Sequence, residues 1–420
     1  MSDIGELAAR IEANTRIFQD YLKKHDLPMP SHEVKFDQKP STEQLPDDVA
    51  VAQTTAIEDS YELRNLLMGP AGSMLDASSE LKALSLQFIL RFKIHKLVKP
   101  GETMTFEEIA LKCNLDALDT RRLLRMGMAE HIFQEPQPGV VAHTAASQAL
   151  ADDVLLASWL DMVVQELWPC YSKLVDSITK YPGSEEANQT AYSLVHNTTL
   201  TAFQLWEQDP VRAARMGDGM SYWKKSPGFE PEILTTAYDF SNITTFIDVG
   251  GSHGFISIAL ARQHPHLKIT VQDLPATIKS AKAQGFPPED VRDRVSFMAH
   301  DFWSTQPIEG ADMYYFRLVF HDWSDEYCCR ILRQLAPALI PGSRILINDA
   351  CVPPWGLSSP YQARRLQAVD LTVKCFSNAR ERAEEDWRAL FRKADTRFKF
   401  LAVTMPTKSA LALIEAEWSP

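Results

Sequence analysis

The run Phe246-Ile-Asp-Val-Gly-Gly-Ser-His-Gly254 decides the fold of this chain. An apolar strand leads into a glycine-rich turn, and a helical pattern begins immediately after it. Gly250, Gly251 and Gly254 allow the backbone to approach a ligand closely, and the first turn of the helix presents unpaired N–H groups. The run therefore predicts a ligand site, although a plain tight turn would use the same glycines.

The expected ligand follows from the acids around this turn. A second strand pattern, 268–274, places Asp273 and Leu274 at its end, where an acid can accept hydrogen bonds from ribose hydroxyls. The glycine spacing does not match the dinucleotide fingerprint G-x-G-x-x-G. Asp248 would repel a pyrophosphate but suits a cation. Because S-adenosylmethionine carries a sulfonium and an ammonium, the sequence favours it over NAD.

Strand and helix patterns alternate from residue 244 onward, which predicts a parallel sheet with helices on both faces. A final antiparallel pair is expected at 398–404 and 410–415. This Rossmann-like α/β arrangement, closed by a hairpin, is typical of class I methyltransferases. The expected strands are 244–249, 268–272, 294–299, 312–318 and 343–348, and the expected helices are 255–263, 275–284 and 325–338.

Composition restricts the partners and the compartment. The chain has 420 residues, a formal net charge of −12 and a pI of about 5.4, which argues against nucleic acid or a membrane as the main partner. No apolar run approaches the length of about 18 residues that a membrane span needs, and the N-terminus lacks a signal pattern. Six cysteines without a C-x-x-C pair predict reduced thiols and no metal site. A cytoplasmic protein is expected.

Four segments are expected along the chain. The first holds N-terminal helices at 4–24 and 51–68, a proline-containing surface linker at 28–48, and the stretch 81–97, whose apolar residues on more than one face suggest burial between partners. The segments are 1–100 for these helices and dimerisation, 101–150 for a winged-helix-like module, 151–235 for a helical connector that walls the substrate pocket, and 236–420 for the cofactor-binding domain.

The 101–150 module raises the possibility of DNA binding. Helices are expected at 105–112 and 117–129, followed by a short ribbon at 132–142. A DNA reader should carry a basic face, but this module holds four basic and seven acidic residues. A packing or dimerisation role is therefore preferred.

Residues 153–230 have a helical pattern throughout and contain Trp206, Met216 and Met220. Such a stripe belongs to a hydrophobic core more often than to a pocket. Because it lies just before the cofactor domain, these three residues are also candidates for the substrate pocket.

Ligands in doubly wound sheets bind at the carboxyl ends of the strands. Asp301 and Phe302 are expected there, where the acid could bind the exocyclic amine of an adenine and the ring could cover one of its faces. Trp323 could cover the other face.

His321 follows the strand at 312–318, and possible orienting acids are Asp349, at the end of the next strand, and Glu381. A histidine at such a position is more often structural. A neutral imidazole with a pKa near 6.5 can nevertheless take a proton at physiological pH, and a carboxylate behind it fixes the tautomer. The chemistry suggested is deprotonation of a hydroxyl beside a methyl sulfonium.

The segments FIDVGGSHG, VQDLP, HDFW, FRLVFHDWSDEYCCRIL and NARERAEEDW resemble those of plant-type and fungal small-molecule O-methyltransferases. The resemblance extends over residues 55–420 and implies a homodimer formed through N-terminal helices. It implies a general base at His321 with orienting acids at Asp349, where plant members have Glu, and Glu381. It also implies cofactor contacts at Gly250, Asp273, Asp301, Phe302 and Arg317.

The sequence thus predicts an S-adenosylmethionine-dependent O-methyltransferase acting on a phenolic or enolic hydroxyl of a small secondary metabolite, a polyketide or alkaloid, without a metal. Asp322 and Asp370 are further candidates for the pocket. One alternative is a pericyclase or dehydratase that keeps the cofactor as a bound charge. A more remote one is a cofactor-sensing winged-helix regulator.

Overall fold

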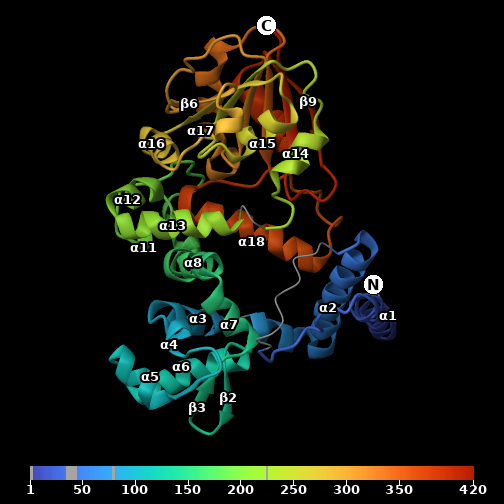
Figure 1. Cartoon of the computed structure of the whole chain (residues 1–420), viewed down its shortest axis with the longest axis vertical. Helices are drawn as coiled ribbons and strands as arrows, with labels where there is room; N and C mark the ends of the chain where they lie inside the picture. Colours follow the sequence, from blue (N-terminus) through green and yellow to red (C-terminus); the bar gives the residue numbers. More distant parts are fainter. Residues whose placement is uncertain (1–2, 35–44, 78–80, 224–225) are drawn as a thin grey trace. The chain divides into compact units, whose positions relative to one another are not determined.

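The computed structural model describes residues 3–34, 45–77, 81–223 and 226–420 and is drawn in Figure 1. The chain forms two compact units. The first comprises Met1–Pro169, Val211–Tyr222 and Trp355–Arg365, and the second comprises Cys170–Pro210, Trp223–Pro354 and Leu366–Pro420. The 101–150 module lies entirely in the first unit, whereas the expected 151–235 connector is shared between both. The linker expected at 28–48 falls partly outside the described residues.

The second unit contains a seven-stranded sheet with the order β6-β5-β4-β7-β8-β10-β9. The first five strands in this order pair in parallel, and β10 pairs antiparallel with both β8 and β9. The expected parallel sheet closed by an antiparallel hairpin is confirmed. The strands are β4 (Thr245–Val249), β5 (Lys268–Asp273), β6 (Val295–Ala299), β7 (Met313–Arg317), β8 (Arg344–Asp349), β9 (Phe398–Thr404) and β10 (Ala412–Trp418).

Helices cover both faces of this sheet. Successive residues of a strand point to opposite sides, so apolar side chains lie on both faces and must be buried. In β7, Tyr314 and Phe316 belong to one hydrophobic cluster, whereas Met313 and Tyr315 belong to the other. The first cluster includes α17 (Asp325–Leu335) and α19 (Glu384–Ala394). The second includes α14 (Pro231–Ala237), α15 (Phe255–Gln263) and α16 (Pro275–Ala283).

The second unit also contains shorter helical pieces. They are α10 (Leu174–Lys180), α11 (Ala191–Val195), α12 (Ala202–Gln208) and three 3₁₀ turns, η2 (Glu289–Val291), η3 (Phe320–Asp322) and η4 (Ala336–Ala338). The expectation that 153–230 is helical throughout is wrong at 181–190, which forms turns. Pro182 lacks a backbone donor and Gly183 adopts a φ of 68°, so a helix cannot continue there. α9 (Trp168–Tyr171) and α18 (Pro360–Ser377) belong partly to each unit.

The first unit is mainly helical, and its predicted helices form with small differences. α1 (Ile4–Lys24) and α6 (Ala117–Ala129) have the expected limits. The stretch 81–97 forms two helices rather than one, because Lys93 between them is left-handed, with a φ of 52°. The other elements are α2 (Asp47–Ala77, kinked at Gly69), α3 (Leu81–Arg91), α4 (Ile94–Leu97), α5 (Phe106–Cys113), α7 (Ala145–Asp152), α8 (Val154–Met162), the π-helix η1 (Val163–Leu167) and α13 (Pro210–Trp223).

A three-stranded sheet of order β1-β3-β2 completes the winged-helix-like module. Its strands are β1 (Thr103–Thr105), β2 (Gln134–Gln137) and β3 (Val140–Ala142). Within the described ranges, no helix combines the length and the apolar character that a membrane span requires. The same ranges hold no group of three or more His, Cys, Asp or Glu side chains arranged to bind a metal ion.

Candidate active site

The glycine turn after β4 lies directly over the carboxylate of Asp248. Backbone N–H groups of Gly250 and Gly251 both donate to the carbonyl of Gln272, at 2.8 and 3.0 Å. A Cβ atom at Gly251 would lie 2.5 Å from the carboxyl carbon of Asp248. Gly250 and Gly254 have φ angles of 77° and 70°. The turn can therefore approach this acid only with glycine in place.

Asp248 is buried, with 2% of its surface exposed. Burial raises the pKa of its carboxyl to about 6, against the hydrogen bond from Ser257, whose Oγ donates to Oδ2 at 2.6 Å. Asp273 adds repulsion and Arg317 adds attraction. A positive ligand charge near this acid would stabilise its ionised form. The buried carboxylate thus fits a cationic cofactor.

Asp273 lies at the end of β5 and binds the glycine turn. Its Oδ2 accepts the N–H of Ser252 at 2.9 Å, and its Oδ1 accepts the N–H of Leu274 at 2.7 Å. Each carboxylate oxygen has a second lone pair, so ribose hydroxyls can still be bound. The acid, the glycine turn and Asp248 together fit a cationic nucleoside cofactor such as S-adenosylmethionine.

Phe302 and Trp323, which were expected on the two faces of an adenine, contact each other edge to face. The rings of Phe302 and Trp323 are nearly perpendicular, at 79° with centroids 6.4 Å apart, rather than parallel. Trp323 stacks with Phe203 at 5.2 Å and with Tyr327 at 5.7 Å. Its place on the second adenine face stays a prediction, and its observed role is in an aromatic cluster. Asp301 accepts the N–H of Trp303 at 3.0 Å.

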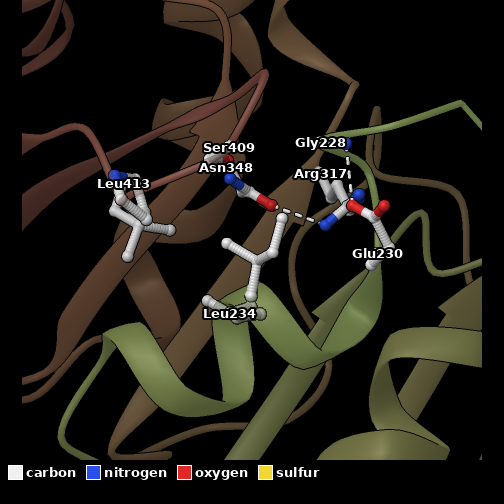
Figure 2. A pocket seen from close by; sticks show the side chains of 9 residues that line it. Gly228, Glu230, Leu234, Arg317, Asn348, Ser409 and Leu413 are labelled. Carbon is white, nitrogen blue, oxygen red and sulfur yellow. Dashed lines mark hydrogen bonds between the residues drawn. The ribbon is translucent and has the colours of Figure 1, made fainter. Parts of the chain in front are cut away.

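Arg317, expected to contact the cofactor, lines the small pocket of Figure 2. Its Nη1 donates to Asn348 Oδ1 at 2.8 Å, and its Nη2 donates to the carbonyl of Phe229 at 2.7 Å. Its guanidinium therefore connects β7 and β8 to the chain before α14, and its charge also lowers the pKa of Asp248. A direct cofactor contact stays a prediction.

His321 lies in η3, the short turn after β7. Its Nδ1 is 3.3 Å from Oε1 of Glu381, a carboxylate with 5% of its side chain exposed. Its Nε2 is 3.6 Å from Oδ1 of Asp322, which is beyond hydrogen-bond length. Among the described residues, buried Nε2 has no hydrogen-bond partner. The geometry leaves Nε2 available for an acceptor molecule.

Asp349 supports the backbone of this turn rather than the imidazole. Its Oδ2 accepts the N–H groups of Phe320 and His321, at 3.0 and 3.3 Å. Burial raises the pKa of Asp349 to about 7, against the attraction of His321. Asp349 was expected to orient the imidazole ring. Its side chain, shorter than the Glu of plant members, binds only the N–H groups of the turn.

Asp370, expected in the pocket wall, supports Glu381. Its Oδ1 accepts the N–H of Glu381 at 2.8 Å, and burial raises the pKa of its carboxyl. Glu381 is thereby held from α18 while its own side chain meets the histidine. The structure brings Asp370 to the site as a neighbour of the orienting acid.

The carboxylates around His321 favour the protonated form of its imidazole. Burial acts to lower the pKa of its imidazole, but Asp322, Glu381 and Asp349 together outweigh it and raise the pKa to about 10. The neutral ring that a general base needs therefore stays a prediction.

Trp206 belongs to a buried aromatic cluster in the second unit. Its Nε1 donates to the hydroxyl of Tyr192 at 2.9 Å, and its ring stacks with Phe376 at 5.9 Å. Phe203 contacts both Trp206 and Trp323, so the cluster reaches the chain two residues from His321. Met216 and Met220 lie on α13 in the first unit. Their place in a pocket stays a prediction.

Three further residues near the site were not predicted from the sequence: Phe203, Phe376 and Arg382. Phe203 and Trp206 lie three residues apart on α12, a spacing that places them on one helical face. Arg382 follows Glu381 directly and is fully buried. The sequence did indicate Arg382 in one respect, because Glu381 has an arginine on each side.

Three comparisons bear on this site. Residues 171–397 match the family model described as O-methyltransferase domain. O-methyltransferase kk1A of Curvularia clavata is 36% identical over 100% of this chain and 98% of its own length. Chlorophenol O-methyltransferase of Trichoderma longibrachiatum is 33% identical over 98% of this chain and 89% of its own length. A solved structure described as a pericyclic reaction enzyme has a TM-score of 0.72 at 21% identity, over 97% of this chain and 99% of its own, a likeness of fold alone.

Proposed function

The chain belongs to the O-methyltransferase domain family and is an S-adenosylmethionine-dependent O-methyltransferase, and from this premise we propose that His321 is its general base. The observation that carries the proposal is the buried pair of His321 and Glu381, with Nδ1 held at 3.3 Å and Nε2 without a partner among the described residues. A base needs one ring nitrogen fixed and the other available.

The cofactor would be held by the chain's acids and glycines. When bound, S-adenosylmethionine supplies a methyl group on a cationic sulfur. We assign its ribose hydroxyls to Asp273, its positive charge to the region of Asp248, and its close approach to the turn at Gly250 and Gly251. The burial of the Asp248 carboxylate supports this assignment. So does the turn at Gly251, where a Cβ atom would collide with that carboxylate.

His321 moves the proton of the acceptor. Nε2 takes the hydroxyl proton, while Glu381 on Nδ1 fixes the tautomer and stabilises the imidazolium. Because the surrounding acids favour a protonated ring, the base form grows as the pH rises or as positive charge enters the site. Binding of a cation near the acids therefore favours proton loss from the ring.

We propose a phenolic or enolic acceptor in a small secondary metabolite. A phenol has a pKa of about 10, close to that of His321, so proton transfer between them is nearly balanced. We place such a ring beside the aromatic cluster of Phe203, Trp206 and Phe376, of which Phe203 is only partly buried. The chlorophenol enzyme among the relatives acts on a molecule of this class by its name.

The pericyclase alternative shares the fold but not this requirement for a base. The likeness to a pericyclic enzyme at 21% identity speaks only for the fold, whereas the relatives over the whole chain are O-methyltransferases. The deciding experiment incubates the protein with labelled S-adenosylmethionine and a panel of phenols. Transfer of label to a phenol supports methylation, and substrate loss without S-adenosylhomocysteine would contradict it.

We further propose a cytoplasmic homodimer. None of the six cysteines, all of which lie in the described ranges, forms a disulfide, which suits a reducing compartment. Leu67 and Met74 on α2 expose 67% and 74% of their surface, as expected for residues that a second chain covers. By contrast, Phe88 and Ile89 of α3 are buried within the chain. Light scattering should give twice the 47.4-kDa chain mass, and the mass of one chain at micromolar concentration would contradict the dimer.

A further inference from the structure

We propose that Arg382 is a positioning residue for methyl transfer, because its guanidinium holds both ends of the turn that carries His321. The proposal rests on the proposed role of His321 as base. Arg382 touches neither ring nitrogen of that histidine. Its effect would pass through the backbone.

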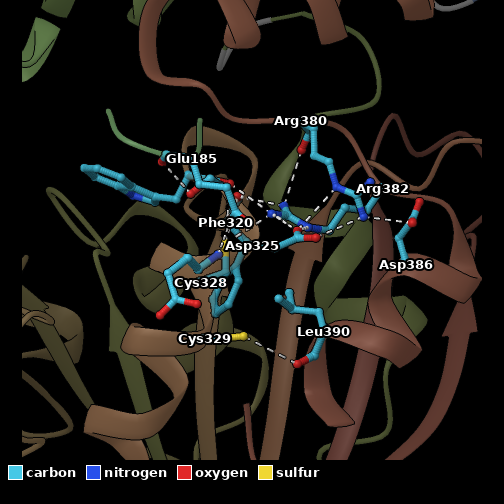
Figure 3. Close-up of polar contacts among 12 residues, drawn as sticks. Glu185, Phe320, Asp325, Cys328, Cys329, Arg380, Arg382, Asp386 and Leu390 are labelled. Atoms are coloured by element: carbon cyan, nitrogen blue, oxygen red, sulfur yellow. Dashed lines mark hydrogen bonds and ion pairs between the residues drawn. The ribbon is translucent and has the colours of Figure 1, made fainter. Parts of the chain in front are cut away.

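Arg382 contacts residues at both ends of the turn, and Figure 3 shows its side chain with Phe320 and Asp325. Its Nη1 donates to the carbonyl of Phe320 at 3.0 Å, and its Nη2 donates to the carbonyl of Trp323 at 2.9 Å. Its Nε donates to Oδ1 of Asp325, the first residue of α17, at 2.9 Å. The two carbonyls lie immediately before and after the pair His321 and Asp322. The guanidinium therefore spans the catalytic histidine.

The turn depends on such external contacts. η3 is a three-residue 3₁₀ turn, with a bond of 3.2 Å from the N–H of Asp322 to the carbonyl of Val319. Short 3₁₀ segments have poor hydrogen-bond geometry and are easily deformed. Asp349 binds the turn's N–H groups and Arg382 binds its carbonyls. These two buried side chains hold opposite backbone groups of one turn.

Glu381 and Arg382 are neighbours in the chain but hold different parts of His321. Glu381 binds the imidazole, and Arg382 binds the backbone around it. The carbonyl of Arg382 accepts the N–H of Val352 at 2.9 Å, which fixes this segment to the chain just after β8. Loss of the guanidinium contacts would therefore let the turn shift relative to Glu381.

Arginine suits this place better than lysine. The guanidinium is fully buried and has five hydrogen-bonding partners: Phe320, Trp323, Asp325, the carbonyl of Arg380 and Sγ of Cys328. A planar fork can address several fixed acceptors at once, whereas an ammonium is a point donor on a flexible stem. A lysine at this position would reach only part of this set. Burying the positive charge of Arg382 costs free energy, and its ion pair with Asp325 offsets that cost.

The test compares Arg382→Lys with Arg380→Gln in the full chain. Arg380 shares the Asp325 partner and also binds Asp386, but its side chain contacts neither carbonyl of the turn. For Arg382→Lys we expect kcat to fall by about 10²-fold, the effect of a misplaced catalytic group, with unchanged cofactor affinity. Backbone amides of residues 319–324 should exchange hydrogen faster, while those of 249–254 should not. Arg380→Gln should leave kcat and the hydrogen exchange of residues 319–324 unchanged.

Two results would overturn the proposal. One is normal kcat and normal exchange in a folded Arg382→Lys variant. The other is a loss of cofactor affinity and thermal stability that accounts for the whole loss of kcat, because that shows only a structural brace. If Arg382→Lys does not fold, Asp325→Asn takes its place, since it removes the carboxylate that aligns Nε. A smaller fall in kcat with faster exchange at 319–324 is then expected, and normal values of both would refute the role.

A parallel His321→Ala variant separates this proposal from the function proposed above. If His321→Ala retains full methyl transfer, the base assignment fails and the positioning role fails with it. If His321→Ala is inactive while Arg382→Lys is fully active, only the role of Arg382 is refuted.

Discussion

Oε1 of Glu381 lies 3.3 Å from Nδ1 of His321, and this contact decides which nitrogen of the ring can do chemistry. With Nδ1 facing a buried carboxylate, Nε2 is the atom left for an acceptor hydroxyl. Asp370 holds the backbone of Glu381 and Asp349 holds the backbone of His321. Each member of the pair is thus fixed by an acid of its own.

The protein without ligands should contain a histidine that titrates near pH 10. Because nearby acids raise the pKa of His321 above its usual value, its imidazole stays protonated through neutral pH. NMR of histidine-labelled protein should show this resonance among the 11 histidines and its loss in His321→Ala. Glu381→Gln should move the titration to lower pH. A resonance that titrates near 6.5 would contradict the assigned charge state.

The same shift has a defined sign for stability. A group whose pKa is higher in the folded protein stabilises the fold fully below its unfolded pKa, about 6.5, and loses that contribution as the pH rises through about 10. The stability difference between the wild type and His321→Ala should therefore become less favourable to the wild type between pH 7 and 10. Denaturant unfolding at several pH values measures it.

Gly251→Ala should damage the cofactor site by steric conflict alone. The new Cβ would lie 2.5 Å from the carboxyl of Asp248, so the turn or the acid must move. Overpacking of this kind costs about 1–3 kcal/mol of stability. We also expect weaker binding of S-adenosylmethionine by calorimetry. Gly217→Ala is the matched control, because a Cβ there meets nothing within 4 Å and alanine favours a helix. Unchanged affinity in Gly251→Ala would remove this turn from the site.

Asp273→Ala should weaken cofactor binding by about 1.5–3 kcal/mol, which is typical of lost hydrogen bonds to a charged group. Part of the loss would come from the turn, because Asp273 also accepts the N–H groups of Ser252 and Leu274. Asp273→Asn keeps an oxygen for one of these and should lose less. Normal affinity in a folded Asp273→Ala variant would place the ribose elsewhere.

The sequence predicted the parts of this site that depend on local pattern. β4, the glycine turn and α15 have a strong strand–turn–helix signal, and strand ends place Asp248 and Asp273 at one edge of the sheet. Partners of individual side chains were harder to predict. Asp349 binds N–H groups of the turn, and Trp323 joins an aromatic cluster, because side-chain length and packing across distant segments decide these contacts. The raised pKa of His321 depends on the adjacent Asp322 and also on Glu381 and Asp349, which come from separate parts of the chain and whose places in space no local pattern gives.

His321→Ala decides between methyl transfer and the pericyclase alternative. A general base contributes about 10²–10⁴-fold, so methylation should fall by at least about 10²-fold, with little change in cofactor affinity. Glu381→Gln should lower the rate in the same direction but less, since it disturbs only the orientation and charge of the imidazole. Raising the pH should partly restore the activity of His321→Ala, because a phenol with a pKa of about 10 ionises without help.

A pericyclase would instead consume its substrate while one equivalent of S-adenosylmethionine survives many turnovers. Chromatography of S-adenosylhomocysteine against substrate loss distinguishes the two, and the absence of S-adenosylhomocysteine during turnover would leave His321 polarising a substrate oxygen rather than accepting its proton.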